Sequence, residues 1–524
     1  MTTTRAVWIF VLVLTAIRLA LLNSTELSPD EAYYWMWAQR PALAYFSKGP
    51  GVAFFIRSSV AIFGDNEFGV RFWSPILGGA TSLLLYYFAQ RLFTSLAGFW
   101  TVVALNVTPI FNLGNLVMTI DPLSIFFWVA AFYTFWIAIE RSPHFSRWWP
   151  LTGLLVGLGF LCKYTNALEL ISILVVLILA RRLRREFLRP NLYLLLLVFG
   201  LCTIPPIVWN SQHAWITVHH LKSRGSLDQT PGIHPLELFS FLAEHFATYS
   251  PLLFLGLAWA TIRSWRRAEQ NFKVLYLFWF GLPVFILYTL LSINKAAAPN
   301  WDGLAFLSLA ILAISYWRER SASRQRARNW MSAAVLLGLV MSAALIVTMV
   351  SPVGTGRHGR DPTDRLRGWR TFAQAVNNFR SDFEKQTGSR VFLIADERDR
   401  AAELAFYLPD KRVEGPRHPP VYIPESQDMV NQFSFWPRYD EFVPLPPNRE
   451  PDPNEIYTEE EGRNLFAGRT ALYLQLGEKA APARSIRGGF ARTQQIGTIQ
   501  VRSGSRLLRQ FNVYACYDYR TMPL

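Results

Sequence analysis

Long apolar runs recur through the first two thirds of the chain, and they limit its fold more than any other feature. Examples are Trp8 to Leu22, Leu170 to Ala180, Leu192 to Ile204 and Val274 to Leu291. Several approach the roughly 20 residues that a helix needs to cross a hydrocarbon core about 30 Å thick. Over its 524 residues the chain is 51% hydrophobic. A sequence of this kind is too apolar for an ordinary water-soluble enzyme and requires a membrane as its solvent.

About eleven membrane spans are expected from the positions of these runs. We place them near residues 6–23, 70–90, 96–113, 121–139, 150–162, 165–180, 191–209, 250–264, 273–291, 302–317 and 330–350. After Val350 the composition shifts toward Pro, Arg, Asp and Gly, and no later segment is apolar enough to cross a bilayer. The sequence therefore predicts a polytopic α-helical membrane domain over residues 1–350 and a soluble domain over residues 351–524.

The soluble domain has the pattern of a small α/β fold. Buried strands are expected at residues 390–395 and 470–475, a helix at 400–407, and later strands at 494–501 and 510–516. The Pro-rich stretch from Pro409 to Pro453 is expected to be irregular surface loop.

The net charge of +15 would suit a nucleic-acid partner, but the charges alternate with the apolar runs, which argues against one. Loops on one side hold most of the basic residues: Arg91, Arg141, Arg147, Arg181, Arg182, Arg184, Arg185, Arg189, Arg263, Arg266, Arg267, Lys273, Arg318, Arg320, Arg324, Arg326 and Arg328. The opposite loops hold only Arg40, Lys48, Arg57, Lys163, Lys222, Arg224 and Lys295. The positive-inside rule makes the Arg-rich side cytoplasmic. The amino terminus is then cytoplasmic, and an odd number of spans places the carboxy-terminal domain outside the cytoplasm. The expected location of the protein is the inner membrane.

Two outer loops, Ser24 to Gly69 and Asn210 to Tyr249, are long and carry aromatic and charged residues at helical spacing. Amphipathic helices on the membrane surface are expected in both.

Two acids stand at outer ends of apolar spans, where an unused charge is costly. Asp30 follows the first span in Ser28-Pro29-Asp30-Glu31, and Asp121 precedes Pro122 at the start of the fourth. Either segment could equally be a helix N-terminal cap. If both acids serve one site, they can supply the general base that glycosyl transfer needs.

Four cations on the same outer face could pair with a phosphate leaving group: Lys48, Lys163, Arg224 and Lys295. For Lys163 and Lys295, snorkelling of the side chain to the membrane surface is the competing interpretation.

Motifs of several other enzyme classes are missing from the sequence. It contains no Walker loop, dinucleotide fingerprint, HExxH or nucleophile elbow, and its three cysteines have neither disulfide nor metal-site spacing. Gly153, Gly157 and Gly159 in one span are interpreted as helix-packing positions, not as a phosphate loop.

An ordered series of segments covers nearly all of the membrane region, which makes it more specific than any single motif. Its segments are Asp30 to Trp35, Tyr45 to Pro50, Phe63 to Asp65 with Gly69 to Arg71, Asp121-Pro122, Gly157 to Thr165, and Pro299 to Trp301. The series resembles the aminoarabinose-transferase and protein-mannosyltransferase type of GT-C glycosyltransferases.

The resemblance implies a multi-span enzyme that takes a sugar from a polyprenyl phosphate in the outer leaflet. It passes the sugar, with inversion, to a lipid, glycan or protein acceptor. In this interpretation Asp30 is the catalytic base, Asp121 supports the site and Lys48 holds the donor phosphate. Tyr34 and Tyr45 fall on aromatic positions near that phosphate.

Further roles follow from the same resemblance. Additional donor-phosphate contacts are expected from Lys163 and Arg224, and acceptor or supporting contacts from Glu31, His245, Lys295 and Asn300. No cofactor is certain, and the sequence leaves open whether a divalent metal ion is bound by Asp30, Asp121 and His245. Ser47 and Gly49 depart from the usual Glu and Pro of the family segment, which puts the identity of donor and acceptor in doubt.

Two other classes compete with the enzyme. A transporter or lipid flippase would carry ionisable residues near the centres of its spans, whereas these spans are nearly uncharged there. An envelope scaffold would leave Asp30, Lys48 and Asp121 without a role, so that replacing them would change nothing. The sugar, the acceptor, the prenyl length and the oligomeric state are not set by the sequence.

Overall fold

A computed structural model of the chain describes residues 2–226, 232–294, 297–298, 300–351, 362–443, 457–458, 462–477, 481–504 and 506–520. The chain divides into two compact units. Unit 1 comprises Met1–Ser24 and Pro41–Val353, and unit 2 comprises Thr25–Arg40 and Gly354–Leu524. The sequence analysis placed Thr25–Arg40 in the membrane domain, so the position of this segment in unit 2 is the main difference from the expected division.

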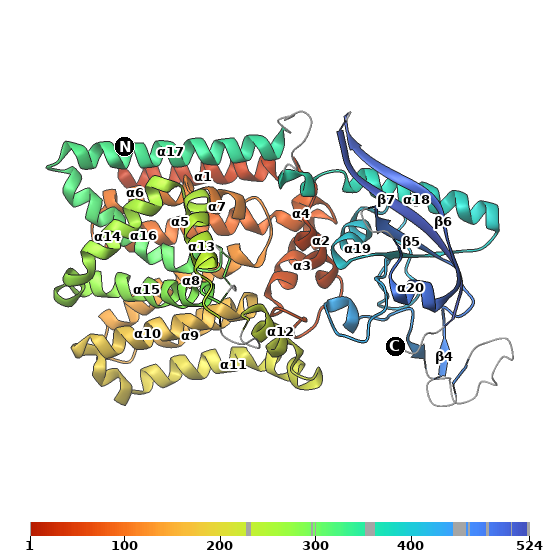
Figure 1. The fold of residues 1–524 in the computed structure, drawn as a ribbon. Helices are drawn as coiled ribbons and strands as arrows, with labels where there is room; N and C mark the ends of the chain where they lie inside the picture. Colours follow the sequence, from red (N-terminus) through yellow and green to blue (C-terminus); the bar gives the residue numbers. More distant parts are fainter. Residues whose placement is uncertain are drawn as a thin grey trace. The chain divides into compact units, whose positions relative to one another are not determined.

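Unit 1 is helical throughout the residues described, and its long helices run roughly parallel to one another (Figure 1). The elements are α1 (Thr3–Leu21), α3 (Gly51–Phe63), α4 (Glu67–Arg71), α5 (Trp73–Leu92), α6 (Ser95–Asn106), α7 (Pro109–Gly114), α8 (Ile120–Glu140), α9 (Trp148–Cys162), α10 (Leu168–Leu179), α11 (Pro190–Gln212), α12 (Ile216–Arg224), α13 (Pro235–Tyr249), α14 (Pro251–Gln270), α15 (Phe272–Ser292), α16 (Gly303–Ser321) and α17 (Gln325–Val350). Short 3-10 helices span Tyr164–Ala167 and Arg181–Leu188.

Five helices of the described chain are each long and apolar enough to cross a membrane: α1, α8, α11, α15 and α17. A sixth span results if α13 and α14, which are bent by 115° at Ser250, are counted as one. Every span expected from the sequence falls mainly on helix, although the runs at 70–90, 96–113 and 165–180 are each divided between two helical elements. An α-helical membrane protein with a small sheet domain is confirmed, whereas the expected number of about eleven spans stays a prediction.

Helix α8 lies at the centre of unit 1, since 78% of its most apolar window is buried. Its rings pack on those of α5 and α15: the centroid of Phe132 lies 4.6 Å from that of Phe88 and 5.4 Å from that of Tyr276. Close ring packing of this kind adds to the stabilisation from burial alone. Asp121 therefore lies in the first turn of a helix that is held by packing on its neighbours.

Helices α9 and α11 approach closely because small residues lie between them. A Cβ atom on Gly153 would lie 2.1 Å from the carbonyl oxygen of Leu195, and one on Gly157 would lie 2.5 Å from Cβ of Cys202. Contacts this short leave no room for a side chain. The expected packing role of these two glycines is confirmed.

Unit 2 contains a four-stranded sheet in the order β1-β5-β7-β6, in which β1 and β5 are parallel and the other pairs are antiparallel. A smaller sheet has the order β2-β4-β3. The elements are α2 (Pro29–Ala38), α18 (Trp369–Thr387), β1 (Phe392–Ala395), α19 (Arg398–Tyr407), β2 (Phe442–Val443), β3 (Tyr457–Thr458), β4 (Gly462–Asn464), β5 (Ala471–Leu476), α20 (Arg484–Gly489), β6 (Phe490–Ser503) and β7 (Arg506–Tyr519). The four expected strands and the expected helix of the soluble domain are confirmed, with β6 and β7 longer than expected.

Helix α18, which the sequence analysis did not predict, lies along the β6–β7 hairpin (Figure 1). The ring of Phe372 stacks on that of Phe511 at 3.9 Å. Gly497 in β6 gives room to Phe379, whose ring would lie 2.8 Å from a Cβ atom at that position.

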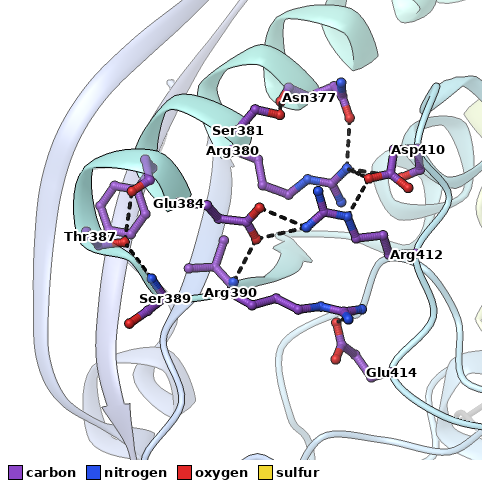
Figure 2. Close-up of polar contacts among 12 residues, drawn as sticks. Asn377, Arg380, Ser381, Glu384, Thr387, Ser389, Arg390, Asp410, Arg412 and Glu414 are labelled. Carbon is purple, nitrogen blue, oxygen red and sulfur yellow. Dashed lines mark hydrogen bonds and ion pairs between the residues drawn. The ribbon is translucent and has the colours of Figure 1, made fainter.

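Charged side chains fasten the other side of α18 to the segment that follows α19 (Figure 2). The carboxylate of Glu384 accepts hydrogen bonds from Nη1 of Arg412 at 2.8 and 3.0 Å. Nearby, Nη2 of the buried Arg380 donates to Oδ2 of Asp410 at 3.2 Å. These pairs hold residues 410–412 against α18.

The buried carboxyl of Glu425 makes the free energy of unfolding of unit 2 depend on pH. Burial raises the pKa of Glu425 to about 7, and Asp440 acts in the same direction. The hydroxyl of Tyr519 donates to this carboxyl. Because the folded state favours the protonated form, unit 2 is most stable below the ordinary pKa of Glu and loses stability as pH rises toward 7.

We expect Glu425→Gln to remove this dependence, since an amide keeps the shape of the protonated acid and carries no charge. Between about pH 4.5 and pH 7 the wild type should lose roughly 3 kcal/mol more than the variant. Denaturant unfolding in detergent, followed by hydrogen exchange of the β7 amides, measures this difference. Equal pH dependence in both proteins would contradict the assignment.

Candidate active site

Lys48 lies in a tight turn that is packed on the end of α9. The backbone N of Tyr45 donates to O of Lys48 at 2.9 Å, and N of Lys48 donates to O of Tyr45 at 3.3 Å. A Cβ atom on Gly49 would lie 2.2 Å from the carbonyl oxygen of Leu161. This contact places the turn beside the residues that lead directly into Lys163. It also gives a physical reason for glycine at position 49, where the family segment has Pro.

Gly49→Ala is therefore expected to lower kcat/KM for the donor by about tenfold or more, because a displaced backbone misplaces Lys48. The obstructing atom belongs to the backbone and cannot rotate away. Gly200→Ala is the matched control, since a Cβ atom there would meet nothing within 4 Å. Steady-state rates over a range of donor concentrations distinguish the two variants, and equal kinetics would contradict the role of the close contact.

Asp121 and Lys163 form an ion pair, with Nζ of Lys163 2.7 Å from Oδ1 of Asp121. Thr119 is the N-cap of α8 and accepts from N of Asp121 at 3.2 Å, so the interpretation of Asp121 as the cap is wrong. Lys163 is only 8% exposed, which does not fit a snorkelling side chain. Asn300 adds a third polar group, because its Nδ2 donates to Oδ2 of Asp121 at 3.3 Å.

Arg224, at the end of α12, joins the same neighbourhood. Its guanidinium carbon lies 5.6 Å from the ring centroid of Trp301, the residue after Asn300. Helix α12 also reaches the Lys48 turn, because the rings of Phe46 and His220 are 4.8 Å apart.

These contacts connect the Lys48 turn, through α12 and Trp301, to Asn300, Asp121 and Lys163. Lys163 in turn follows the end of α9, on which the Lys48 turn packs. Unit 1 thus brings together six of the predicted residues: Tyr45, Lys48, Asp121, Lys163, Arg224 and Asn300. Lys295 lies outside the residues that the structure describes.

His245 and Asp302 form a second, fully buried pair in unit 1. Nε2 of His245 lies 2.8 Å from Oδ2 of Asp302, and both side chains are 0% exposed. Nδ1 of His245 lies 2.6 Å from the carbonyl oxygen of Phe241, which can only accept a hydrogen bond. The sequence analysis missed Asp302, although an acid just before an apolar span was the signal that had singled out Asp121.

Asp30, Glu31 and Tyr34 belong to unit 2, on α2. Glu31 is buried, and its Oε2 accepts from N of Ser28 at 2.8 Å in a capping box. The capping interpretation therefore holds for Ser28 and Glu31, and the expected acceptor role of Glu31 stays a prediction. The side chain of Asp30, in contrast, is 57% exposed and lies 3.8 Å from the guanidinium of Arg398.

Comparison with known proteins identifies the class to which this arrangement belongs. Residues 47–209 match the family described as dolichyl-phosphate-mannose-protein mannosyltransferase. The lipid A galacturonosyltransferase RgtD of Rhizobium johnstonii is 27% identical over 425 residues, which cover 80% of this chain and 86% of that protein. The undecaprenyl phosphate-alpha-4-amino-4-deoxy-L-arabinose arabinosyl transferase of Erwinia tasmaniensis is 26% identical over 372 residues, or 63% of this chain and 62% of the relative.

The fold agrees with these relatives. The crystal structure of ArnT from Cupriavidus metallidurans bound to undecaprenyl phosphate aligns over 98% of both chains, with a TM-score of 0.63 and 16% identity. The apo structure of the same protein gives a TM-score of 0.59. This chain is a glycosyltransferase, and the family match, the relatives and the shared fold support the GT-C aminoarabinose-transferase type.

In this glycosyltransferase, the groups in unit 1 are suited to a phosphate leaving group. Lys48, Lys163 and Arg224 are cations, and the ion pair with Asp121 restrains the ammonium of Lys163. Fixed cations that face a developing negative charge need no reorganisation during the reaction.

Among the described residues of this glycosyltransferase, no group of three or more His, Cys, Asp or Glu side chains is arranged to hold a metal ion. The contacts of His245 with Phe241 and Asp302 engage both ring nitrogens, so no lone pair is available for a ligand bond. His245 therefore does not fit the ligand set considered with Asp30 and Asp121.

Proposed function

We propose that this glycosyltransferase moves a sugar from a polyprenyl phosphate to a lipid acceptor at the outer face of the inner membrane, inverting the anomeric centre. The series of contacts in unit 1 that links the three cations Lys48, Lys163 and Arg224 is the observation that carries the proposal. The named activities of the galacturonosyl and arabinosyl relatives support a lipid acceptor and a lipid-linked donor. A glycan or protein acceptor is the alternative, in line with the mannosyltransferase family description.

The proposed reaction is a single displacement. The acceptor oxygen forms a bond to the anomeric carbon of the donor while the bond from that carbon to the phosphate oxygen breaks. The electron pair leaves with the polyprenyl phosphate, whose charge is neutralised by Lys48, Lys163 and Arg224. Asp30 takes the proton of the acceptor hydroxyl as general base. A phosphate leaving group is already activated, so no covalent enzyme intermediate is needed.

The proposed topology has eleven spans, a cytoplasmic amino terminus and an extracytoplasmic unit 2. The concentration of arginine in alternate loops supports it. Arg487 in α20 is exposed and offers a site for labelling. In intact cells, Arg487→Cys should react with a membrane-impermeant maleimide, and protection until the cells are lysed would reverse the topology.

Transfer by purified protein in lipid nanodiscs tests the function. Undecaprenyl-phosphate-linked galacturonic acid and 4-amino-4-deoxy-L-arabinose are supplied as donors and lipid A as acceptor, with the corresponding nucleotide sugars as controls. We expect transfer from a lipid-linked donor and none from nucleotide sugars, with competition by free undecaprenyl phosphate. Transfer from nucleotide sugars alone would contradict the proposed donor class.

A further inference from the structure

The segment that carries Asp30 is an integral part of unit 2. Backbone N of Leu27 donates to the hydroxyl of Tyr407 at 2.7 Å, and backbone N of Gln432 donates to the hydroxyl of Tyr33 at 2.6 Å. The carboxylate of Glu26 accepts hydrogen bonds from the first backbone N–H groups of α18, at 2.6 and 3.2 Å. A carboxylate at that position also compensates the positive end of the helix dipole.

Side-chain packing strengthens this attachment, and α2 and α19 lie side by side in unit 2 (Figure 1). The ring of Trp35 meets that of Phe406 edge-on at 5.0 Å, while Nζ of Lys411 lies 4.7 Å from the Trp35 ring. Nη2 of Arg40 donates to the carbonyl oxygen of His418 at 2.7 Å. Helix α2 is thus held by residues that follow it by several hundred positions, and its orientation depends on them.

Arg398, the first residue of α19, is held in place by contacts on two sides. Its Nε lies 3.0 Å from Oδ1 of Asp399, and its guanidinium carbon lies 4.9 Å from the ring centroid of Tyr33. The remaining Nη2 lies 3.8 Å from Oδ1 of Asp30. At this separation the two charges attract without a full hydrogen bond. Arg398 therefore brings a positive charge to the exposed carboxylate from a neighbouring helix.

We propose that Arg398 is a positioning residue for Asp30. The guanidinium orients the carboxylate and favours its ionised form, which is the form that can accept a proton. This inference rests on the proposed function, in which Asp30 is the general base. The ring contact with Tyr33 and the pair with Asp399 keep the guanidinium from turning away.

Among the described groups that act on Arg398 or adjoin Asp30 in the chain, the titratable ones are acids and phenols. Asp399 and Glu31 are acids, and Glu31 is engaged by the backbone of Ser28. Tyr33 and Tyr34 are neutral phenols near neutral pH, and burial raises the pKa of Tyr33 further. The carboxylate of Asp399 disfavours a second negative charge nearby, and the guanidinium of Arg398 offsets that effect.

The test compares Arg398→Gln, Arg398→Lys and Arg487→Gln, the last of which removes the same charge from an exposed position of α20 in the same unit. The pH–rate profile of kcat/KM and the KM for undecaprenyl-phosphate-linked sugar are measured for each in nanodiscs. In Arg398→Gln we expect the acidic limb to move up by roughly half a pH unit and the rate to fall about tenfold. Arg398→Lys should restore part of both effects, and Arg487→Gln should match the wild type.

Two results would overturn the proposal. The first is an acidic limb of the pH–rate profile that is unchanged in Arg398→Gln. The second is a rise in the KM for the donor with no shift of that limb, which would assign Arg398 to donor binding. Asp30→Asn is measured in parallel to separate this inference from the proposed function. If that variant loses transfer while Arg398→Gln keeps the wild-type profile, only the inference fails. If Asp30→Asn retains transfer, the proposed base itself is wrong.

Discussion

Replacement of Asp30 by asparagine is expected to lower kcat for sugar transfer by about a hundredfold to ten-thousandfold, the usual contribution of a general base. An amide has nearly the same shape as the carboxylate but cannot take the proton of the acceptor hydroxyl. The fold should be little affected, because the Asp30 side chain is 57% exposed and the capping box of α2 is formed by Ser28 and Glu31. Initial rates with a lipid-linked donor measure the loss, and binding of undecaprenyl phosphate shows whether the donor site survives.

Asp428→Asn provides the matched control for this experiment. It makes the same chemical change at an exposed position of unit 2, and its rate should stay within a factor of about two of the wild type. A rate for Asp30→Asn that is close to that of the control would falsify the assignment of Asp30 as base. Loss of both transfer and undecaprenyl phosphate binding would point to damage of the donor site instead.

The helical membrane unit could be predicted from sequence because its controlling signal is local. An apolar run such as Val274 to Leu291 must satisfy its own backbone groups in lipid, and a helix does so within the run. The structure accordingly places α15 at Phe272–Ser292. The strands of unit 2 were predictable for a similar reason, since short blocks of buried apolar residues mark them.

The membership of Thr25–Arg40 in unit 2 could not be predicted in this way. Every residue of α2 from Glu31 to Ala38 is buried, so no polar face marks its surroundings. Its partners, among them Tyr407 and Gln432, lie several hundred residues later in the chain. Local patterns carry no information about contacts of that range, and for the same reason the pair of Asp30 with Arg398 was not foreseen.

The candidate site was predicted only in part, because residue type and place in sequence do not decide between neighbouring acids. Asp121 and Glu31 both occupy first turns of helices, but only Glu31 takes part in capping, while Thr119 caps the helix of Asp121. The pairing of Asp121 with Lys163 joins residues 42 positions apart. The chemical roles of these residues in transfer stay predictions, and the variants proposed above test them.

Exchange of the charges of Asp121 and Lys163 is expected to restore the stability that either single change removes, without restoring transfer. Asp121→Lys places two ammonium groups together and Lys163→Asp two carboxylates. Each should destabilise unit 1 by about 3 kcal/mol, because Lys163 is almost fully buried. The double variant re-forms an ion pair. However, its carboxylate at position 163 then lies beside the Lys48 turn, where it repels a donor phosphate.

Thermal unfolding in detergent and transfer from a lipid-linked donor, measured for both single variants and the double variant, separate the structural effect from the chemical one. Arg91 and Glu140 supply the control, since their exposed pair at 2.6 Å can be exchanged in the same way. Exposed pairs contribute little, so that exchange should change neither stability nor rate appreciably. A double variant of Asp121 and Lys163 that folds and transfers sugar at the wild-type rate would show that the pair is only structural. The donor phosphate would then have to be bound by Lys48 and Arg224 without Lys163.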